Sequence, residues 1–225
     1  MQSLPFNLAT TKALLFDMDG TVTDNIPYHI RSWRIWANRE GLPHSEAELL
    51  ALTHGTIGEI MRRLFPDATA EERFLRGERK EAIYRELYQP HLSSLPGLEE
   101  FLSWARQQSL PLAIATAGDA TNIAYTVDGL KIRSFFDVLV GSEDVTHGKP
   151  HPEVYLVAAE RLGVDPESCV AFEDSVAGVE AVRRAGMKCI VVNPMAPREE
   201  YGECPHVLKW IADYRELLPA GNVSS

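Results

Sequence analysis

Two carboxylates stand two positions apart, directly after a short apolar run, in the segment Phe16-Asp17-Met18-Asp19-Gly20-Thr21. If the apolar run is a buried strand, both acids lie at its carboxyl end, where open α/β sheets bind ligands. Two acids this close tolerate burial only beside a divalent cation or a shared proton. One carboxylate can attack phosphorus, and the second can protonate a leaving oxygen and activate water. The alternative is a solvated Asp-Gly turn.

A hydroxyl and an ammonium stand at two further loops. Thr116 closes the apolar run 112–115 and, with Ala117 beside it, is a candidate for binding a phosphate oxygen. Lys149 lies in the loop Gly148-Lys149-Pro150-His151-Pro152, whose prolines restrict the backbone. A fixed ammonium there offsets the charge of several carboxylates and a phosphate. Taken alone, each has a simpler interpretation, as a strand-ending threonine and a surface lysine.

A second pair of acids, Glu173 and Asp174, ends another apolar run. Hard oxygen ligands of this kind suit Mg²⁺, which takes one or two protein carboxylates and keeps several waters. The simpler alternative is that Asp174 or Ser175 caps the next helix, and both interpretations can hold for different residues of the segment. His147 and His151, which flank the Lys149 loop, are interpreted as loop or capping residues rather than as ligands.

Short apolar runs are expected to form the buried strands that position these groups. The runs cover residues 13–16, 111–116, 138–141, 169–173 and 189–192. Helical patterns lie between or after them, one near 120–130, one from Pro152 to Gly163 and one that ends at Gly186. This alternation predicts a parallel α/β sheet with the candidate groups on one edge.

Residues 25–92 contain no convincing strand. Their apolar positions recur at helical spacing in three groups: Ile30, Trp33 and Ala37; Ile57, Ile60, Met61 and Leu64; and Phe74, Ile83 and Leu87. We therefore expect an α/β core domain formed by residues 1–24 and 93–225. A helical domain, residues 25–92, would be inserted after the first strand.

The composition limits the class of partner. A net charge of −10 argues against nucleic acid, because phosphate backbones require a basic face. No apolar stretch approaches the roughly 20 residues of a membrane span, so no membrane partner is expected. Three cysteines, with Cys169 and Cys189 in apolar runs, predict buried free thiols and a reducing cytoplasm. The expected partner is a small phosphorylated metabolite, and the expected state is a monomer or weak dimer.

The order of DMDGT, Thr116, Lys149 and Glu173-Asp174 resembles the haloacid dehalogenase-like hydrolase superfamily over nearly the whole chain. The segments FDMDGTVTD, GKPHPEVY and FEDSVAGVEA are most similar to its sugar-phosphate phosphatase and β-phosphoglucomutase branch. The resemblance implies a Rossmann-like parallel sheet with strand order 3-2-1-4-5 and an inserted helical cap domain. It also implies Mg²⁺ as the cofactor and an aspartyl-phosphate intermediate.

The resemblance further assigns roles to the acids. Asp17 is implied as the nucleophile and Asp19 as the general acid/base. Mg²⁺ is implied to bind Asp17, the main-chain carbonyl of Asp19 and Asp174, with Glu173 as a ligand or as a support behind the ligands. A dehalogenase attacks carbon and needs neither a second acid nor Mg²⁺, so this set of acids favours phosphoryl transfer.

The resemblance also suggests residues that hold the substrate. Thr116 and Lys149 are implied to hold the transferring phosphoryl group. His29 and Lys80 match a hinge histidine and a cap lysine of the β-phosphoglucomutases. Without the resemblance, His29 is equally a helix residue packed beside Trp33, and Lys80 belongs to a solvated, charged helix face.

The leading hypothesis is a Mg²⁺-dependent phosphatase that hydrolyses a phosphorylated sugar or a similar small metabolite. The alternative is a β-phosphoglucomutase-type enzyme, and the third is a non-catalytic binding module on the same fold. By ungapped alignment, Gly58 stands where the mutases have a phosphate-binding arginine, which weakens the mutase hypothesis. Arg62 or Arg63 remains open as a substitute.

Overall fold

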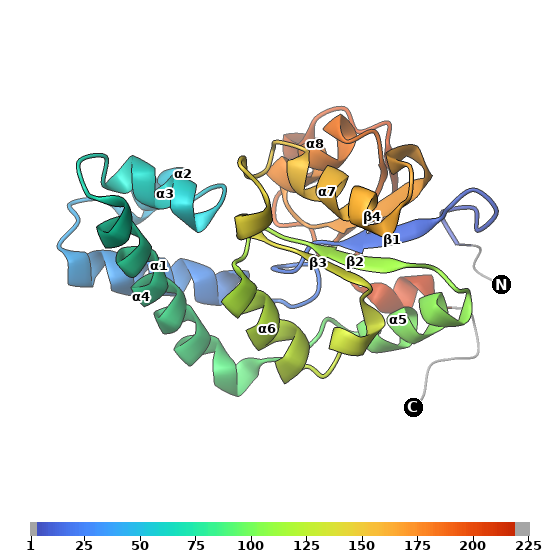
Figure 1. The fold of residues 1–225 in the computed structure, drawn as a ribbon, viewed down its shortest axis with the longest axis horizontal. Helices are drawn as coiled ribbons and strands as arrows, with labels where there is room; N and C mark the ends of the chain where they lie inside the picture. The colour runs from blue at the N-terminus through green and yellow to red at the C-terminus, as the bar shows by residue number, and fades with distance from the viewer. Residues whose placement is uncertain (1–3, 219–225) are drawn as a thin grey trace.

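The computed structural model describes residues 4–218 and contains a sheet unit and a helical unit (Figure 1). The sheet has six parallel strands in the order β3-β2-β1-β4-β5-β6. These are β1 (Ala13–Phe16), β2 (Leu112–Ala115), β3 (Val138–Val140), β4 (Cys169–Glu173), β5 (Lys188–Val192) and β6 (Val207–Ile211). Because β1 is central, the residues that follow it lie beside the ends of β2 and β4.

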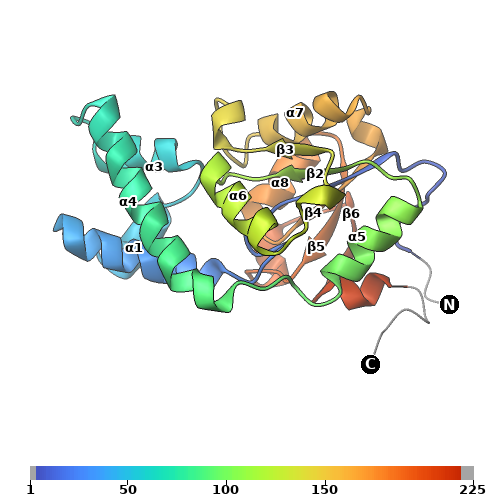
Figure 2. The ribbon, with the colours of Figure 1, turned by 60° about the horizontal axis from the view of Figure 1, so that its bottom comes forward.

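Helices cover both faces of this sheet. The helices are α5 (Leu98–Gln107) and α6 (Ala120–Gly129) on one face, and α7 (Glu153–Leu162) and α8 (Val176–Arg184) on the other (Figures 1 and 2). Successive side chains of a strand point to opposite faces. Phe16 of β1 accordingly packs with Phe101 of α5, whereas Leu15 packs in a second cluster with Ala158 of α7. Burial on both faces explains why the inner strands are continuously apolar.

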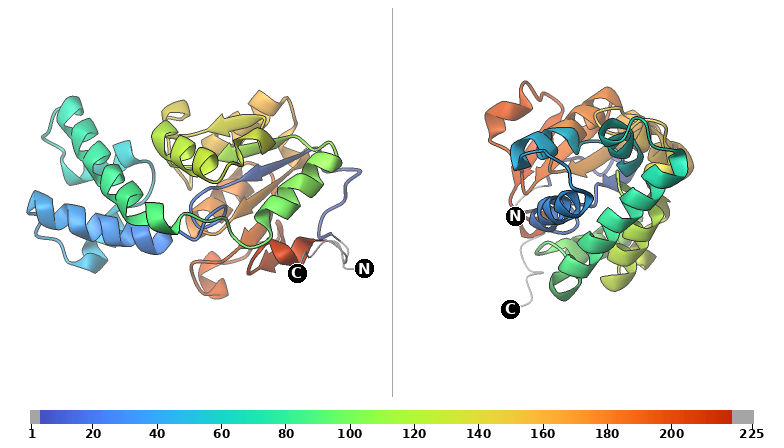
Figure 3. Two further views of the ribbon diagram at one scale, coloured as in Figure 1. Left: turned by 90° about the horizontal axis from the view of Figure 1, so that it is seen from below. Right: turned by 90° about the vertical axis from the view of Figure 1, so that its left-hand side faces the viewer.

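The segment between β1 and α5 forms the helical unit. It contains α1 (Ile26–Glu40), α2 (Glu46–Leu52), α3 (Ile57–Leu64) and α4 (Ala70–Tyr88). These helices share their own apolar cluster around Trp33, Trp36 and Ile60, and the unit stands beside the sheet rather than on either face (Figure 3). The two chain segments that join the units are held together by an antiparallel bridge between Thr23 and Ser94.

The structure confirms the parallel α/β sheet, all five expected strands and the strand order implied by the resemblance. It adds β6, which the sequence analysis did not predict. The helix expected around Phe74, Ile83 and Leu87 is α4, in which the Phe74 side chain is 66% exposed. Cys169 and Cys189 are buried free thiols, as expected. Within residues 4–218, no helix is both long and apolar enough to cross a membrane.

Candidate active site

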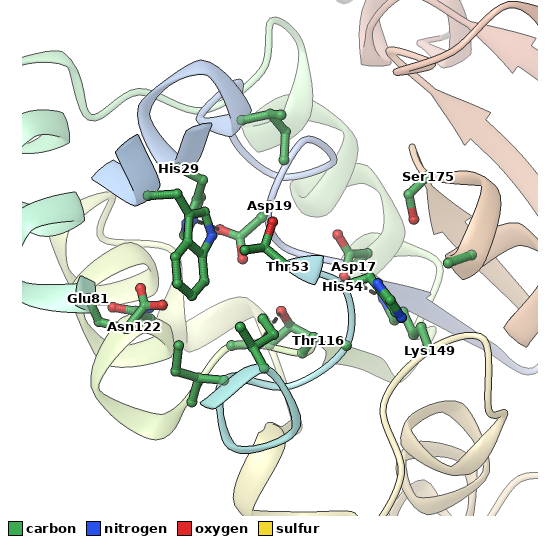
Figure 4. Close-up of a pocket in the computed structure, with 18 of the residues that line it drawn as sticks. Asp17, Asp19, His29, Thr53, His54, Glu81, Thr116, Asn122, Lys149 and Ser175 are labelled. Atoms are coloured by element: carbon green, nitrogen blue, oxygen red, sulfur yellow. Dashed lines mark hydrogen bonds and ion pairs between the residues drawn. The ribbon is translucent and has the colours of Figure 1, made fainter. Parts of the chain in front are cut away.

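A cavity of about 500 Å³ opens between the carboxyl ends of the central strands and the helical unit. Both units line it. Figure 4 shows Asp17, Lys149 and Ser175 of the sheet unit at one end, and Glu81 and Asn122 at the other. Asp19 and His29 lie together at the upper rim in this view. The cavity is therefore placed where open α/β sheets bind their ligands.

Lys149 joins two carboxylates at the sheet end of the cavity. Its Nζ lies 2.5 Å from Asp17 Oδ1 and 2.5 Å from Glu173 Oε1. Burial alone would lower the pKa of this ammonium, but the two acids outweigh burial and raise it. Lys149 is thus a buried, permanently charged cation, and its interpretation as a surface lysine is wrong.

Glu173 is fully engaged by protein hydrogen-bond donors. Besides Lys149, its Oε1 accepts from Tyr155 Oη at 2.7 Å. Its Oε2 accepts from the main-chain N–H groups of Asp174 and Ser175 at 3.0 and 3.1 Å and from Ser175 Oγ at 3.1 Å. Burial raises the pKa of Glu173, but Lys149 and these donors outweigh burial and lower it. Glu173 is therefore an ionised group that fixes the position of Lys149.

Asp174 differs from its neighbour Glu173. Its Oδ2 is buried and has no hydrogen-bond partner among the described residues, while Ser175 caps α8 by accepting from Gly178 N. Ligand atoms of Asp17, Glu173 and Asp174 all lie within 4.8 Å of one another. Burial and the neighbouring acids raise the pKa of Asp174 well above its ordinary value.

These acids form a suitable site for a hard divalent cation. The atoms available as metal ligands are all carboxylate oxygens, and Mg²⁺ prefers oxygen ligands. One of these oxygens, Asp174 Oδ2, has no hydrogen-bond partner among the described residues. Burial, together with Glu173 and Asp19, also raises the pKa of Asp17 to about 8 even though Lys149 opposes it. The single positive charge of Lys149 therefore does not balance the negative charge of these acids. The close fit needs Gly20, since a Cβ there would lie 2.0 Å from Asp174 Oδ2.

Asp19 lies beside this cluster and is held by side chains from the helical unit and its linker. Asn25 Nδ2 donates to Asp19 Oδ1 at 2.5 Å, and His29 Nε2 lies 3.5 Å from the same oxygen. Asn25 also accepts from Gly20 N at 3.1 Å and donates to Tyr84 Oη at 2.6 Å. Burial raises the pKa of Asp19, but His29 and Asn25 outweigh burial and lower it.

A chain of polar contacts continues from His29 into the helical unit. Lys80 Nζ lies 3.0 Å from His29 Nδ1 and 2.9 Å from Glu81 Oε1. Glu81 Oε2 accepts from Asn122 Nδ2 of the sheet unit at 2.8 Å. The ammonium also lies 4.5 Å from the Trp33 ring centroid. Lys80 is only 1% exposed, so the interpretation as a solvated helix face is wrong.

Thr116 and Ala117 line the cavity between its two ends. Thr116 N donates to Val140 O at 3.1 Å, which fixes the strand end, and Thr116 Oγ1 accepts from Gly118 N at 3.0 Å. Its hydroxyl lies between Asp17 and the end of the cavity that carries Glu81 of the helical unit, called the insert end below (Figure 4). Every candidate residue from the sequence analysis except Glu173 lines this cavity, and Glu173 lies directly behind Lys149.

Arg62 and Arg63, which the sequence left open as substitutes for the mutase arginine, do not line this cavity. Thr53, His54 and Gly55 line it, but within residues 4–218 no arginine does. Arg63 donates to the main-chain oxygens of Leu52 and His54. Gly58 and Arg62 line a second cavity, which shares Ile57 and Asp119 with the first.

The sequence analysis missed four residues that organise the site: Asn25, Glu81, Asn122 and Tyr155. Asn25 follows the DMDGT motif closely, so its spacing was a usable signal. Glu81 sits in a charged stretch and Asn122 inside an ordinary helix, so neither carries a local signal. Tyr155 lies one turn into α7, where it was indistinguishable from an apolar helix position.

Comparisons with known proteins agree with this geometry. The sequence model of the haloacid dehalogenase-like hydrolases matches residues 14–192. Hexitol phosphatase A of Escherichia coli is 36% identical over 203 residues, which are 88% of this chain and 90% of that protein. Fructose-1-phosphate phosphatase YqaB of the same species is 32% identical over 181 residues, which are 80% of this chain and 95% of that protein.

A solved structure gives the same result for the fold. The crystal structure of β-phosphoglucomutase from Clostridium difficile has a TM-score of 0.78 and 25% sequence identity, and the match covers 92% of this chain and 93% of that one. The order of the site residues, the strand order and the matched sequence span all agree. The chain therefore belongs to the haloacid dehalogenase-like hydrolase family, in the branch of sugar phosphatases and β-phosphoglucomutases.

Proposed function

We propose that the chain is a Mg²⁺-dependent phosphatase that hydrolyses a small phosphorylated sugar or sugar alcohol. The observation that carries this proposal is the buried cluster at the sheet end of the cavity. There Lys149 joins Asp17 to Glu173, and the unpartnered oxygen of Asp174 lies beside them. This arrangement supplies a nucleophile, a fixed cation and a metal site within a few ångströms. The phosphorylated carbohydrates named for the similar phosphatases support the substrate class.

In this proposal, Asp17, Asp174 and the main-chain carbonyl of Asp19 hold Mg²⁺. Glu173 supports Lys149 from behind rather than binding the ion, because its two oxygens already accept five protein hydrogen bonds, one of them from the Lys149 ammonium. Bound Mg²⁺ would neutralise the acids and polarise the phosphoryl oxygens. Lys149 and Thr116 bind the remaining phosphoryl oxygens. Stabilising this charge contributes much of the acceleration in phosphoryl transfer.

The reaction has two steps. Asp17 attacks phosphorus, the bond to the leaving oxygen breaks, and Asp19 gives that oxygen a proton. Asp19 then takes a proton from water, which attacks the aspartyl-phosphate, releases phosphate and restores Asp17. Because its pKa is lowered in the free enzyme, Asp19 must gain a proton as the anionic substrate enters. His29 Nε2, 3.5 Å from Asp19 Oδ1, is placed to orient this carboxyl group toward the leaving oxygen.

The helical unit serves as the cap in this proposal. It brings Glu81 to the end of the cavity opposite Lys149, and Lys80 lies between Glu81 and His29, where the leaving group would lie. The apolar surface of Trp33, beside Lys80, can pack on a sugar ring. We expect a cytoplasmic monomer or weak dimer, and the free cysteines support that location.

A β-phosphoglucomutase-type activity is the second candidate. It is favoured by the fold match to that enzyme and by the placement of Lys80 and His29 beside Asp19. A mutase must bind a phosphate at each end of its substrate. The cavity has no arginine among the described residues, and its one buried lysine besides Lys149, Lys80, is already paired with Glu81. Since this leaves no unpaired cation of that kind for a second phosphate, hydrolysis is the leading proposal.

The test measures phosphate release from 4-nitrophenyl phosphate and from a panel of phosphorylated sugars and sugar alcohols. A phosphatase releases free phosphate with Mg²⁺ present and stops when EDTA is added. A mutase instead forms glucose 6-phosphate from β-glucose 1-phosphate with little free phosphate, which a coupled dehydrogenase assay detects. Failure of the Mg²⁺-loaded enzyme to turn over any panel member would favour a non-catalytic binding role.

A further inference from the structure

The loop that carries Lys149 has a second set of chemical groups on its outer side. Lys149 points inward and is buried, whereas the side chains of His147 and His151 are 61% and 48% exposed. Glu153, the first residue of α7, lies against both imidazoles. The proposed phosphatase reaction uses none of these three side chains.

Their geometry matches a metal site. Glu153 Oε2 lies 3.4 Å from His147 Nδ1 and 3.7 Å from His151 Nδ1. One ligand atom from each residue lies within 4.8 Å of the other two. In a tetrahedral zinc site, bonds of about 2.0–2.1 Å place ligand atoms roughly 3.4 Å apart. The two distances to Glu153 Oε2 are close to that value, and the imidazole nitrogens lie within 4.8 Å of each other, so side-chain rotations would complete the site.

The three groups are also held in place before any ion binds. Glu153 Oε1 accepts from Thr146 N at 3.0 Å and Oε2 accepts from His147 N at 2.9 Å. Between the histidines, His151 N donates to Gly148 O at 3.0 Å, which closes a turn. Pro150 and Pro152 flank His151 and restrict the backbone further. Little conformational freedom therefore remains to be lost on binding.

We infer that His147, His151 and Glu153 form a second metal site, which binds a transition-metal ion such as Zn²⁺ with water completing the coordination. Two imidazoles and one carboxylate suit zinc and other late first-row transition metals, whereas the all-oxygen cluster at the sheet end of the cavity suits Mg²⁺. The bound ion links residue 147 to residue 153 across the segment that carries Lys149. It therefore fixes this loop from outside. This inference does not depend on the proposed phosphatase activity.

The test is calorimetric titration of Zn²⁺ into the full chain with excess Mg²⁺, which occupies the sheet-edge acids. The wild type binds one Zn²⁺. His147→Ala and His151→Ala each weaken binding by about 10-fold or more, the loss that perturbing a single group at a metal site produces. The matched control is His91→Ala, since His91 is exposed but lies outside the cluster, and it leaves binding unchanged.

A second readout identifies the ligands directly. At one equivalent of Zn²⁺, the imidazole nitrogen NMR signals of His147 and His151 shift while that of His91 does not. The inference is overturned if the wild type and the double variant His147→Ala/His151→Ala take up Zn²⁺ equally. It is also overturned if binding leaves both imidazole signals in place, because then the three groups are only a surface ion pair.

Discussion

The two ends of the active-site cavity are built in different ways. At the sheet end, Asp17 and Asp174 directly follow the neighbouring strands β1 and β4, so backbone pairing sets their separation. At the insert end, His29 of α1 and Lys80 of α4 lie on helices of the helical unit, and side-chain contacts connect them to Asp19. The sheet end is therefore a rigid site that is the same for every substrate. The side-chain contacts at the insert end can adjust to different substrates.

This difference predicts two classes of substitution. Changes at the sheet end reduce turnover of every phosphate ester, because every substrate presents the same phosphoryl group. Changes at the insert end alter selection among substrates. They leave the turnover of 4-nitrophenyl phosphate relatively unaffected, because nitrophenolate leaves without protonation.

Replacing Asp17, the proposed nucleophile, should have the largest effect. Asp17→Asn keeps the shape of the side chain but removes the attacking charge, so kcat should fall by roughly 10⁴-fold or more on all substrates. Phosphate release under saturating substrate measures the loss, and circular dichroism during thermal unfolding checks that the fold is intact. A folded variant that still turns over would exclude covalent catalysis at this residue.

Removing the metal should be nearly as severe and equally independent of substrate. Without a cation, the acids around Lys149 repel both one another and the phosphate, and activity should fall by about 10³-fold. Dialysis against EDTA followed by titration with Mg²⁺ measures the loss and its recovery. Full activity in the dialysed, metal-free protein would contradict the assignment of Asp174 as a ligand.

Asp19→Asn changes the acid that lies between the two ends of the cavity. Loss of the acid should reduce turnover of sugar phosphates by about 10²-fold, because their alkoxide leaving groups need a proton. The first step with 4-nitrophenyl phosphate should be less affected, since nitrophenolate leaves without protonation. Rapid-quench kinetics separates this step from breakdown of the phosphoenzyme. Equal, small effects on both substrates would remove Asp19 from the acid/base role.

Lys80→Met tests the insert end by itself. Turnover of a sugar phosphate, measured as kcat/KM, should fall about 10-fold more than that of 4-nitrophenyl phosphate, equivalent to about 1.4 kcal/mol of selective binding. The change also leaves Glu81 buried without its ion pair, which should lower the free energy of unfolding by about 3 kcal/mol.

The double variant Lys80→Met/Glu81→Gln is the matched control for that experiment. It removes both charges, so it should recover much of the stability while the loss of selectivity remains. If selectivity returns together with stability, then Lys80 acts only by packing and has no contact with the leaving group.

The contact between the two units should give the smallest effect. Glu59 Oε1 of α3 accepts from Gly148 N at 3.2 Å, next to Lys149. Glu59→Gln weakens this contact while keeping an oxygen for the helix cap, so KM should rise about 3-fold, equivalent to about 0.7 kcal/mol, with kcat unchanged. Steady-state kinetics measures both parameters. A large loss of kcat would show that this contact also positions the catalytic groups.

The same contrast explains what the sequence could predict. The inner strands were predictable because burial on both faces makes them continuous apolar runs. β6 was not, because it lies at the edge of the sheet, where Lys209 interrupts the apolar pattern and Leu208 is exposed. The acids were predictable because a strand end fixes their place from local sequence.

The insert end was harder to predict because its residues acquire their roles through tertiary packing. Lys80 lies in a run of charged residues that resembles a solvated face, yet α4 turns it against Trp33 and His29. Its ion-pair partner Glu81 in turn accepts from Asn122, which lies 41 positions further along the chain. No local pattern links them, so only the resemblance to a family pointed to Lys80.

The most direct test of the central claim is a crystal structure of the enzyme with Mg²⁺ and beryllofluoride, a mimic of the phosphoryl group. The account predicts the mimic bonded to an oxygen of Asp17 and contacted by Lys149, with the ion between Asp17 and the Asp174 oxygen that is unpartnered here. An ion bound elsewhere, or a mimic that binds away from Asp17, would contradict it.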